Sequence, residues 1–427
     1  MPSSKRRISL RRIAAGLAIS LALASVADKA LAEDLLSDDE FSFDVEQNAP
    51  SPSAWPEGLE LTAEHLYSQG DKSTSQRSSV GLEFEATPWK GGFLRFENSY
   101  RYYWRGDLLA RRASSDQPYG RNKLSELWLQ QSNQDCYIKA GRQTLFWGAV
   151  EGTFAVDQVT PFDYTESLFT DYSNIRRPQD MILGACFYGQ TKWQAFVTPR
   201  ATLSRISHRD TFAFDEIEDA MNEELGASFQ QSFEGLDLTL FYARLYANTP
   251  VTVLTNSFPP QATLDVARYD LVGLSVVKAI GRLLLEMDLG YKRDQIIAIS
   301  GELEDQLEVA AGFEYTTSGN HQLNAGIWSY KLDTAQLALS SAPSSDRVEQ
   351  FTAGWSKTYD YDDLTMSLLG SWLAKHQQSR LTVHGRYQID DYWQYSAALS
   401  YTETGDLTAS NLVADGWEAS MGVKIDI

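Results

Sequence analysis

A two-residue alternation of apolar and polar side chains recurs along most of this 427-residue chain and limits what it can fold into. Residues 307–315 carry an apolar or aromatic side chain at every odd position and a polar or small one at every even position. Residues 381–388, 393–401 and 417–427 repeat this pattern. A period of two is that of a β-strand with one apolar face. About eighteen such segments follow one another from residue 58 onward, each roughly 8–12 residues long, which is the length that a tilted strand needs to cross a membrane.

The links between these segments alternate in length. Short links such as 189–190 and 234–235 alternate with long ones such as 105–122, 143–180 and 199–223. Outer-membrane barrels sort their connections in this way, with tight periplasmic turns and extended outer loops. The sequence therefore predicts an all-β fold, a transmembrane antiparallel up-and-down β-barrel of about 18 strands (16–18) without a plug domain. Beyond the N-terminus, no apolar run is long enough for a transmembrane helix.

The N-terminus has the layout of a secretory signal. Basic residues between Lys5 and Arg12 precede an apolar stretch at 13–27 and a small-x-small site, Ala30-Leu31-Ala32. We therefore expect residues 1–32 to be a cleaved signal peptide, with an uncleaved membrane anchor as the alternative.

Charge and composition divide the rest of the chain into two parts and exclude nucleic-acid-binding and disordered proteins. The chain has 57 Asp and Glu against 37 Lys and Arg, which gives a net charge of −20. The signal carries six positive charges and one negative charge, so its removal leaves a net charge of −25. Such a chain repels nucleic acid, and a 12% aromatic content is too high for a disordered protein. Residues 33–56 are acidic and rich in Pro and Ser, so we expect a periplasmic leader, either a mobile tail or a docking segment, ahead of a barrel at 57–427.

The usual signs of enzymatic or metal sites are missing from the sequence. The five histidines are scattered and none has the spacing of a metal site, and no Gly-x-Ser-x-Gly motif occurs. We expect neither enzymatic activity nor a metal or cofactor.

The two cysteines, Cys136 and Cys186, lie in consecutive predicted strands. Their midpoint, residue 161, is close to the centre of the link 143–180, so an antiparallel pairing with that register would place them opposite each other, within disulfide distance. Export to an oxidising compartment permits the bond. The alternative is that both are small apolar residues on the lipid face.

The C-terminus carries a second barrel signal. The pattern Gly-x-x-apolar-x-apolar, formed by Gly422, Ile425 and Ile427, looks like the terminal assembly signal of outer-membrane barrels. Ile427 stands where an aromatic residue is usual.

The longest link, 143–180, is the third outer loop and the candidate functional site. A barrel of about eighteen strands has an interior that side chains alone do not fill, so we expect this loop to fold inward. Acidic residues facing basic ones across a narrow pore would produce a transverse field. The alternative is a surface lid held by ordinary salt bridges, with Arg142 and Arg177 touching lipopolysaccharide phosphates. The candidate pore residues are Arg142, Gln143, Trp147, Asp157, Asp163, Glu166, Asp171, Arg176 and Arg177.

The same loop carries a family resemblance. The motifs Gly141-Arg142-Gln143-x-x-x-Trp147-Gly148, Asp157-x-x-x-Pro161-x-Asp163 and Arg177-Pro178 resemble the core signature of a proteobacterial outer-membrane barrel family of largely unassigned function. That family is similar to alginate-export barrels and to eighteen-stranded substrate-specific porins. Thr160 departs from the pattern, which usually has Asn before the proline. The resemblance implies a transport or envelope role and supplies no substrate.

Together these features predict a porin-like channel in the cell outer membrane that passes or exports a hydrophilic solute, with the third outer loop as constriction or gate. Its expected partners are outer-membrane lipid and lipopolysaccharide, the barrel-assembly machinery and a periplasmic protein at the leader. The alternatives are a non-channel envelope protein, such as an assembly partner or adhesin, and a barrel enzyme. Because charge facing lipid is costly, charged strand residues should face the lumen or the rims. These are Glu83, Glu85, Arg95, Glu97, Arg101, Lys139, Glu308, Glu314, Arg380 and Arg386.

Overall fold

The fold is known from a computed structural model, which describes twelve stretches of the chain. They are residues 58–70, 74–105, 118–150, 152–163, 175–205, 214–254, 261–296, 301–331, 347–359, 363–374, 377–403 and 416–426. The proposed signal peptide, the leader, Glu166, Asp171 and Ile427 lie outside these described residues. Within them, no helix is long and apolar enough to cross a membrane.

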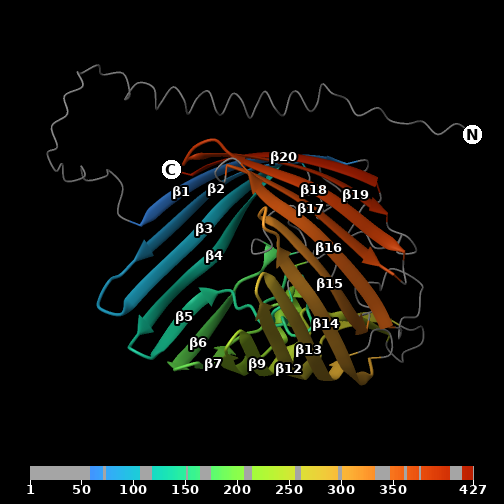
Figure 1. The fold of residues 1–427 in the computed structure, drawn as a ribbon. Coiled ribbons are helices and arrows are strands. Elements are labelled where there is room, and N and C mark those ends of the chain that lie inside the picture. Colours follow the sequence, from blue (N-terminus) through green and yellow to red (C-terminus); the bar gives the residue numbers. More distant parts are fainter. Residues whose placement is uncertain are drawn as a thin grey trace, which may run out of the picture. The chain divides into compact units, whose positions relative to one another are not determined.

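Eighteen antiparallel strands form one closed barrel (Figure 1). They are β1 (Leu59–Gly70), β2 (Thr74–Ala86), β3 (Gly92–Arg105), β4 (Tyr119–Ser132), β5 (Cys136–Gln143), β6 (Gln179–Tyr188), β7 (Thr191–Thr198), β8 (Glu224–Phe233), β9 (Leu236–Tyr246), β12 (Arg268–Ile280), β13 (Leu283–Ile296), β14 (Leu303–Thr316), β15 (His321–Lys331), β16 (Arg347–Tyr359), β17 (Leu364–Leu373), β18 (Gln378–Gln388), β19 (Trp393–Glu403) and β20 (Gly416–Asp426). A short helix, α2 (Phe214–Ala220), and a separate two-stranded sheet, β10 (Val251–Leu254) with β11 (Ala262–Asp265), lie in long links.

Each strand pairs with its sequence neighbour in the barrel, and β9 pairs with β12. The barrel closes between its first and last strands, where Thr62 pairs with Asp426 and Gly70 with Glu418. Gly422 and Ile425 lie within this seam on β20. The predicted all-β, antiparallel barrel of about 18 strands is therefore confirmed, while an assembly role for the C-terminal motif stays a prediction.

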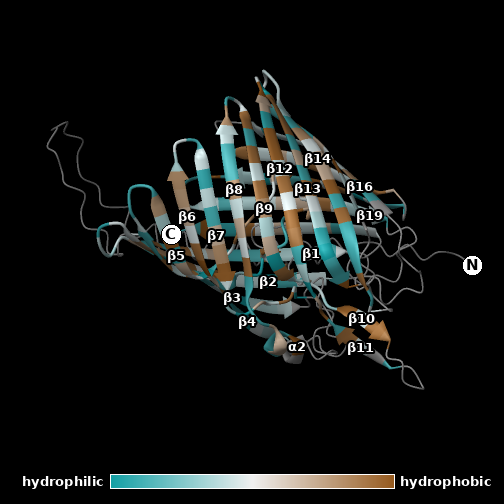
Figure 2. Ribbon diagram, turned by 90° about the horizontal axis from the view of Figure 1, so that it is seen from below, coloured by the Kyte–Doolittle hydropathy of each residue, from teal (hydrophilic) through white to brown (hydrophobic). Residues whose placement is uncertain are grey.

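Alternate residues of each strand face opposite sides of the wall, as Figure 2 shows by the alternation of hydropathy along the strands. On the outer face, Val272 and Leu307 are 52% and 53% exposed. On the inner face, Asp288 and Glu308 are 1% and 3% exposed, because they lie against other polar groups and against the third long link. The apolar face is thus turned outward and the polar face inward, as a membrane barrel requires.

A disulfide joins β5 to β6. Cys136 and Cys186 are register partners with their Cα atoms 4.1 Å apart, and the two sulfur atoms are bonded. They lie on the outer face, at the short-turn end of the strands that carry the longest link.

We predict that this disulfide forms in the exported protein. Denatured without reductant, the protein should gain no mass from an alkylating reagent, and after reduction it should gain two alkyl groups. Two alkyl groups gained without reduction would contradict the bond.

Candidate functional site

The link between β5 and β6 folds against the inner wall of the barrel. After β5, Leu145 and Trp147 turn to the wall, and the Trp147 ring lies 5.4 Å from that of Phe196 on β7 and 5.0 Å from that of Phe241 on β9. Val156 joins them in a buried apolar core. This core, within the barrel, binds the first part of the link to β6–β9 and β12.

Glycines on the inner wall make room for the link. A Cβ atom at Gly290 on β13 would lie 1.9 Å from the carbonyl oxygen of Ala155, and one at Gly273 on β12 would lie 2.6 Å from Val156. A Cβ atom at Gly226 on β8 would likewise crowd Trp147, and one at Gly312 on β14 would crowd Val150. Four strands of this part of the wall, β8, β12, β13 and β14, therefore have no side chain at the points that the link crosses.

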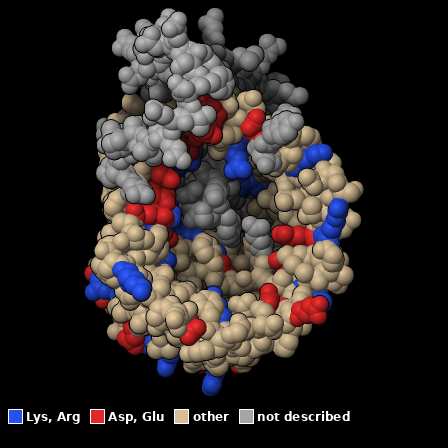
Figure 3. Space-filling model, turned by 60° about the vertical axis from the view of Figure 1, so that its left-hand side comes forward, with Lys and Arg blue, Asp and Glu red and all other residues tan. Residues whose placement is uncertain are grey.

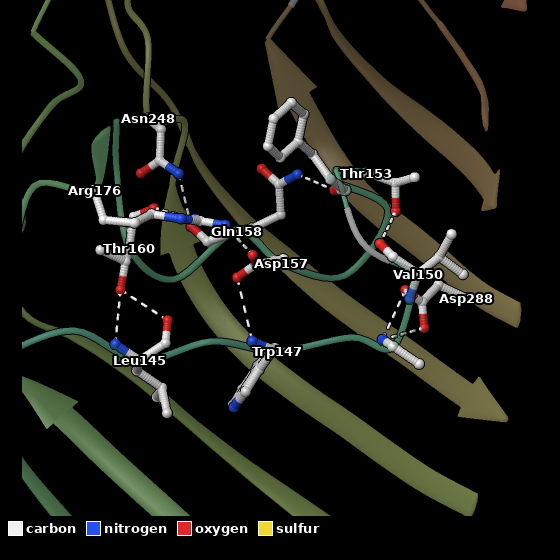
Figure 4. Close-up of polar contacts among 12 residues, drawn as sticks. Leu145, Trp147, Val150, Thr153, Asp157, Gln158, Thr160, Arg176, Asn248 and Asp288 are labelled. Atoms are coloured by element: carbon white, nitrogen blue, oxygen red, sulfur yellow. Dashed lines mark hydrogen bonds and ion pairs between the residues drawn. The ribbon is translucent and has the colours of Figure 1, made fainter. Parts of the chain in front are cut away.

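A buried carboxylate on β13 fixes the tip of the link (Figure 4). Asp288 accepts hydrogen bonds from the backbone N–H groups of Ala149 at 3.0 Å and Val150 at 2.9 Å. Ser275 on β12 donates a third hydrogen bond to the same carboxylate. Hydrogen bonds to a charged acceptor are stronger than neutral ones, so Asp288 is a specific anchor for the tip.

The link then returns beside its outgoing part. Phe154 packs on Trp328 of β15, with ring centroids 5.0 Å apart, and marks the farthest point. On the way back, Thr160 accepts from the N–H of Leu145 at 3.0 Å and donates to its carbonyl at 2.8 Å. Gln179 at the start of β6 donates to the Val159 carbonyl at 2.6 Å. The described residues of 144–163, a range which we call the inner segment, thus run along the wall from β6 to β15 and back.

A buried ion pair holds the two parts of the inner segment together. Arg176, 1% exposed, donates to the carboxylate of Asp157 and, at 2.9 Å, to the Thr160 carbonyl. Its guanidinium lies 4.0 Å from the centre of the Phe162 ring. The Asp157 carboxylate also accepts from the N–H of Trp147 at 3.2 Å. Burial raises the pKa of Asp157 to about 6, against the opposing effect of the Arg176 charge.

Three further ion pairs connect this region to its surroundings. Asp163, 2% exposed, pairs with Arg121 on the inner face of β4 and with Arg205 at 3.6 Å. Arg177 pairs with Glu218 of α2 at 2.5 Å. Among the described charged residues of the third outer loop, Asp157 and Arg176 thus pair with each other, while Asp163 and Arg177 pair with residues outside the loop. The predicted field across a pore stays a prediction.

The two residues before the inner segment lie on different faces of β5. Gln143 is fully buried and donates to the Met181 carbonyl at 3.1 Å. Arg142 lies on the opposite face, 3.5 Å from Asp180, whose side chain is 72% exposed. The structure therefore places Arg142 on the outer face of the barrel and not in the lumen, because adjacent strand residues alternate between faces.

The opposite wall carries the open polar surface. A cavity of about 390 Å³ is lined by β1–β3 and β18–β20, half a turn of the barrel away from the strands under the inner segment. In Figure 3 the molecule is hollowed, with charged side chains of both signs around the opening. Residues lining the cavity include Glu64, Arg77, Arg101, His384, Arg386 and Lys424. Among these, Arg77 and Glu64 pair at 2.7 Å.

The sequence pattern indicated only part of this wall. Arg101 and Arg386 were expected in the lumen and line the cavity. Glu64 and His384 have the same strand parity as their inward neighbours, so alternation was a signal for them too. No sequence signal pointed to Asp288, which differs from other inward carboxylates only in what folds against it.

Comparisons with known proteins agree with this architecture. The family model described as "Protein of unknown function (DUF1302)" matches residues 67–425. The chain belongs to the DUF1302 family. No curated protein matches the sequence.

Among solved structures, the DUF1302 chain is similar to three porin-like proteins. OccD3 of Pseudomonas aeruginosa has a TM-score of 0.52 and 9% identity, over 87% of this chain and 91% of that one. OccAB3 of Acinetobacter baumannii has a TM-score of 0.54 and 10% identity, over 86% and 98%. The outer-membrane protein OpdK of P. aeruginosa has a TM-score of 0.54 and 12% identity, over 86% and 98%. At these identities the likeness shows the fold, an eighteen-stranded barrel of the outer-membrane porin kind.

Proposed function

We propose that this protein is an outer-membrane channel for a hydrophilic solute, uptake and export both being compatible with it, and that the inner segment sets the width of its pore. The observation that carries the proposal is the fit between the inner segment and the wall. Glycines at the crossing points and the Asp288 anchor leave one side of the barrel filled and the opposite, charged side open. A barrel of this size has a lumen wide enough for such an arrangement.

A charged group on β2–β5, two of whose members line the cavity, is rich in carboxylates. Arg95 on β3 faces four carboxylates, with Glu83 at 2.6 Å and Glu126 at 2.8 Å. The other two are Glu85 and Glu97. Lys139, on the inner face of β5, is the other base of this group, and its ammonium lies over the Trp128 ring. Within this group four carboxylates therefore face two bases, and rings of acidic side chains attract cations in narrow pores.

Planar-bilayer conductance of the refolded chain without its signal peptide, residues 33–427, tests the proposal. We expect discrete steps and, in a salt gradient, a reversal potential biased toward cations. A folded, heat-modifiable barrel that gives no steps would contradict the channel, and a non-channel envelope role such as adhesion or assembly would replace it.

A further inference from the structure

The side chains of His321 and Lys357 lie together on the outer face of β15 and β16. His321 and Lys357 are register partners, and the Lys357 Nζ atom lies 3.2 Å from Nε2 of His321. The other ring nitrogen, Nδ1, accepts the indole N–H of Trp355 at 3.0 Å. The Lys357 ammonium also lies 4.8 Å from the centre of the Tyr359 ring.

The indole fixes the tautomer of the histidine. Because an indole N–H can only donate, Nδ1 of His321 carries no proton, and the imidazole holds its hydrogen on Nε2. An ammonium group has donors only. The Nε2–H and the Lys357 ammonium therefore converge on one region, and an oxyanion there would accept from both. Within the described part of the chain, no carboxylate lies within ion-pair distance of Lys357.

The cluster lies at the edge of the apolar outer face. It occupies the end of β15 and β16 where short turns connect the strands, and one residue pair further along, Leu323 and Trp355 face outward beside Leu368. Leu323 and Leu368 are 38% and 39% exposed. A lysine with aromatic neighbours at such an edge is at the depth of lipid headgroups, with its apolar neighbours at the depth of acyl chains.

We propose that Lys357 and His321 bind the phosphate of a membrane phospholipid in the periplasmic leaflet, with its acyl chains along Leu323 and Leu368. The proposal rests on the placement in the outer membrane made above, but not on channel activity. A lipid phosphate is favoured over a free ion because exposed apolar side chains, Leu323 and Leu368, lie beside the donors on the outer face.

Native mass spectrometry of the refolded barrel with added phosphatidylglycerol tests this site. Lys357→Gln should weaken retention of the tightest-bound lipid about tenfold, since charge-assisted hydrogen bonds are lost. His321→Ala should act in the same direction. The matched control is Lys278→Gln on β12, on the same face and end of the barrel, where the ammonium donates to the Glu234 carbonyl at 3.4 Å and has no carboxylate partner among the described residues.

Three results would overturn the proposal. They are retention by Lys357→Gln equal to that of the unsubstituted protein, equal retention of diacylglycerol, which has no phosphate, and full displacement of the lipid by millimolar inorganic phosphate. Single-channel conductance should be the same in Lys357→Gln and in the unsubstituted protein. A bilayer experiment without conductance steps would therefore contradict the channel and would not affect the lipid-binding proposal.

Discussion

Replacing Gly290 by valine is expected to release the inner segment from the wall while the barrel stays closed. The new Cβ atom would lie 1.9 Å from the Ala155 carbonyl oxygen, which belongs to the backbone and cannot turn aside. Overpacking of this kind costs about 1–3 kcal/mol, here in docking of the segment. Valine favours the β conformation, so β13 itself should not be weakened. Amide hydrogen exchange of residues 144–163 should accelerate.

The control for Gly290→Val is Gly184→Val on β6. A Cβ atom at Gly184 would have a single neighbour, the Tyr137 carbonyl oxygen at 3.9 Å, which is an ordinary contact. This variant should exchange like the unsubstituted protein. If Gly290→Val also left exchange of the inner segment unchanged, the segment would not lie against β13.

Replacing Arg176 by methionine should have a second large effect. The substitution keeps much of the side-chain volume but removes the cationic partner of the buried Asp157 carboxylate and the Arg176 donor to the Thr160 carbonyl. Loss of one partner of a buried pair costs about 3–5 kcal/mol. The free energy of opening of the inner segment, measured by hydrogen exchange or by protease cleavage, should fall by about 3–5 kcal/mol.

An exposed ion pair on the same side of the barrel gives the comparison. Arg200 and Asp219 are 3.2 Å apart, with side chains 66% and 74% exposed. Arg200→Gln should cost only about 0–1 kcal/mol, because exposed pairs contribute little. Equal effects of the two substitutions would mean that Arg176 is not a buried anchor.

The barrel could be predicted from sequence because its signal is local. Alternation within 307–315 or 393–401 depends only on which residues face lipid, and each strand repeats it. The opposition of Cys136 and Cys186 followed in the same way from the position of one long link. Neither inference needs knowledge of distant strands.

Strand parity also determines the position of Arg142. Lys139 and Arg142 differ by three positions on one strand, so they must face opposite sides. The parity that predicts Lys139 in the lumen therefore predicts Arg142 outside, where the structure has it beside Asp180.

The docking of the inner segment could not be predicted from sequence. Length suggested that it folds inward, but its anchor, Asp288, lies 138 positions from Val150 along the chain. Which strands the segment crosses depends on barrel closure and on the wall glycines, such as Gly290, that leave space for it. For the same reason, the pairing of Asp157 with Arg176 in a buried contact, and not across a pore, needed the three-dimensional arrangement.

The most direct test of the account is single-channel conductance after removal of the tip of the inner segment. Residues 149–156 can be replaced by two glycines, because Trp147 and Asp157 already lie in hydrogen-bond contact and would be joined by a tight turn. We expect a heat-modifiable barrel whose conductance is several-fold above that of the unsubstituted chain. The same conductance in both proteins would show that the inner segment does not limit the pore.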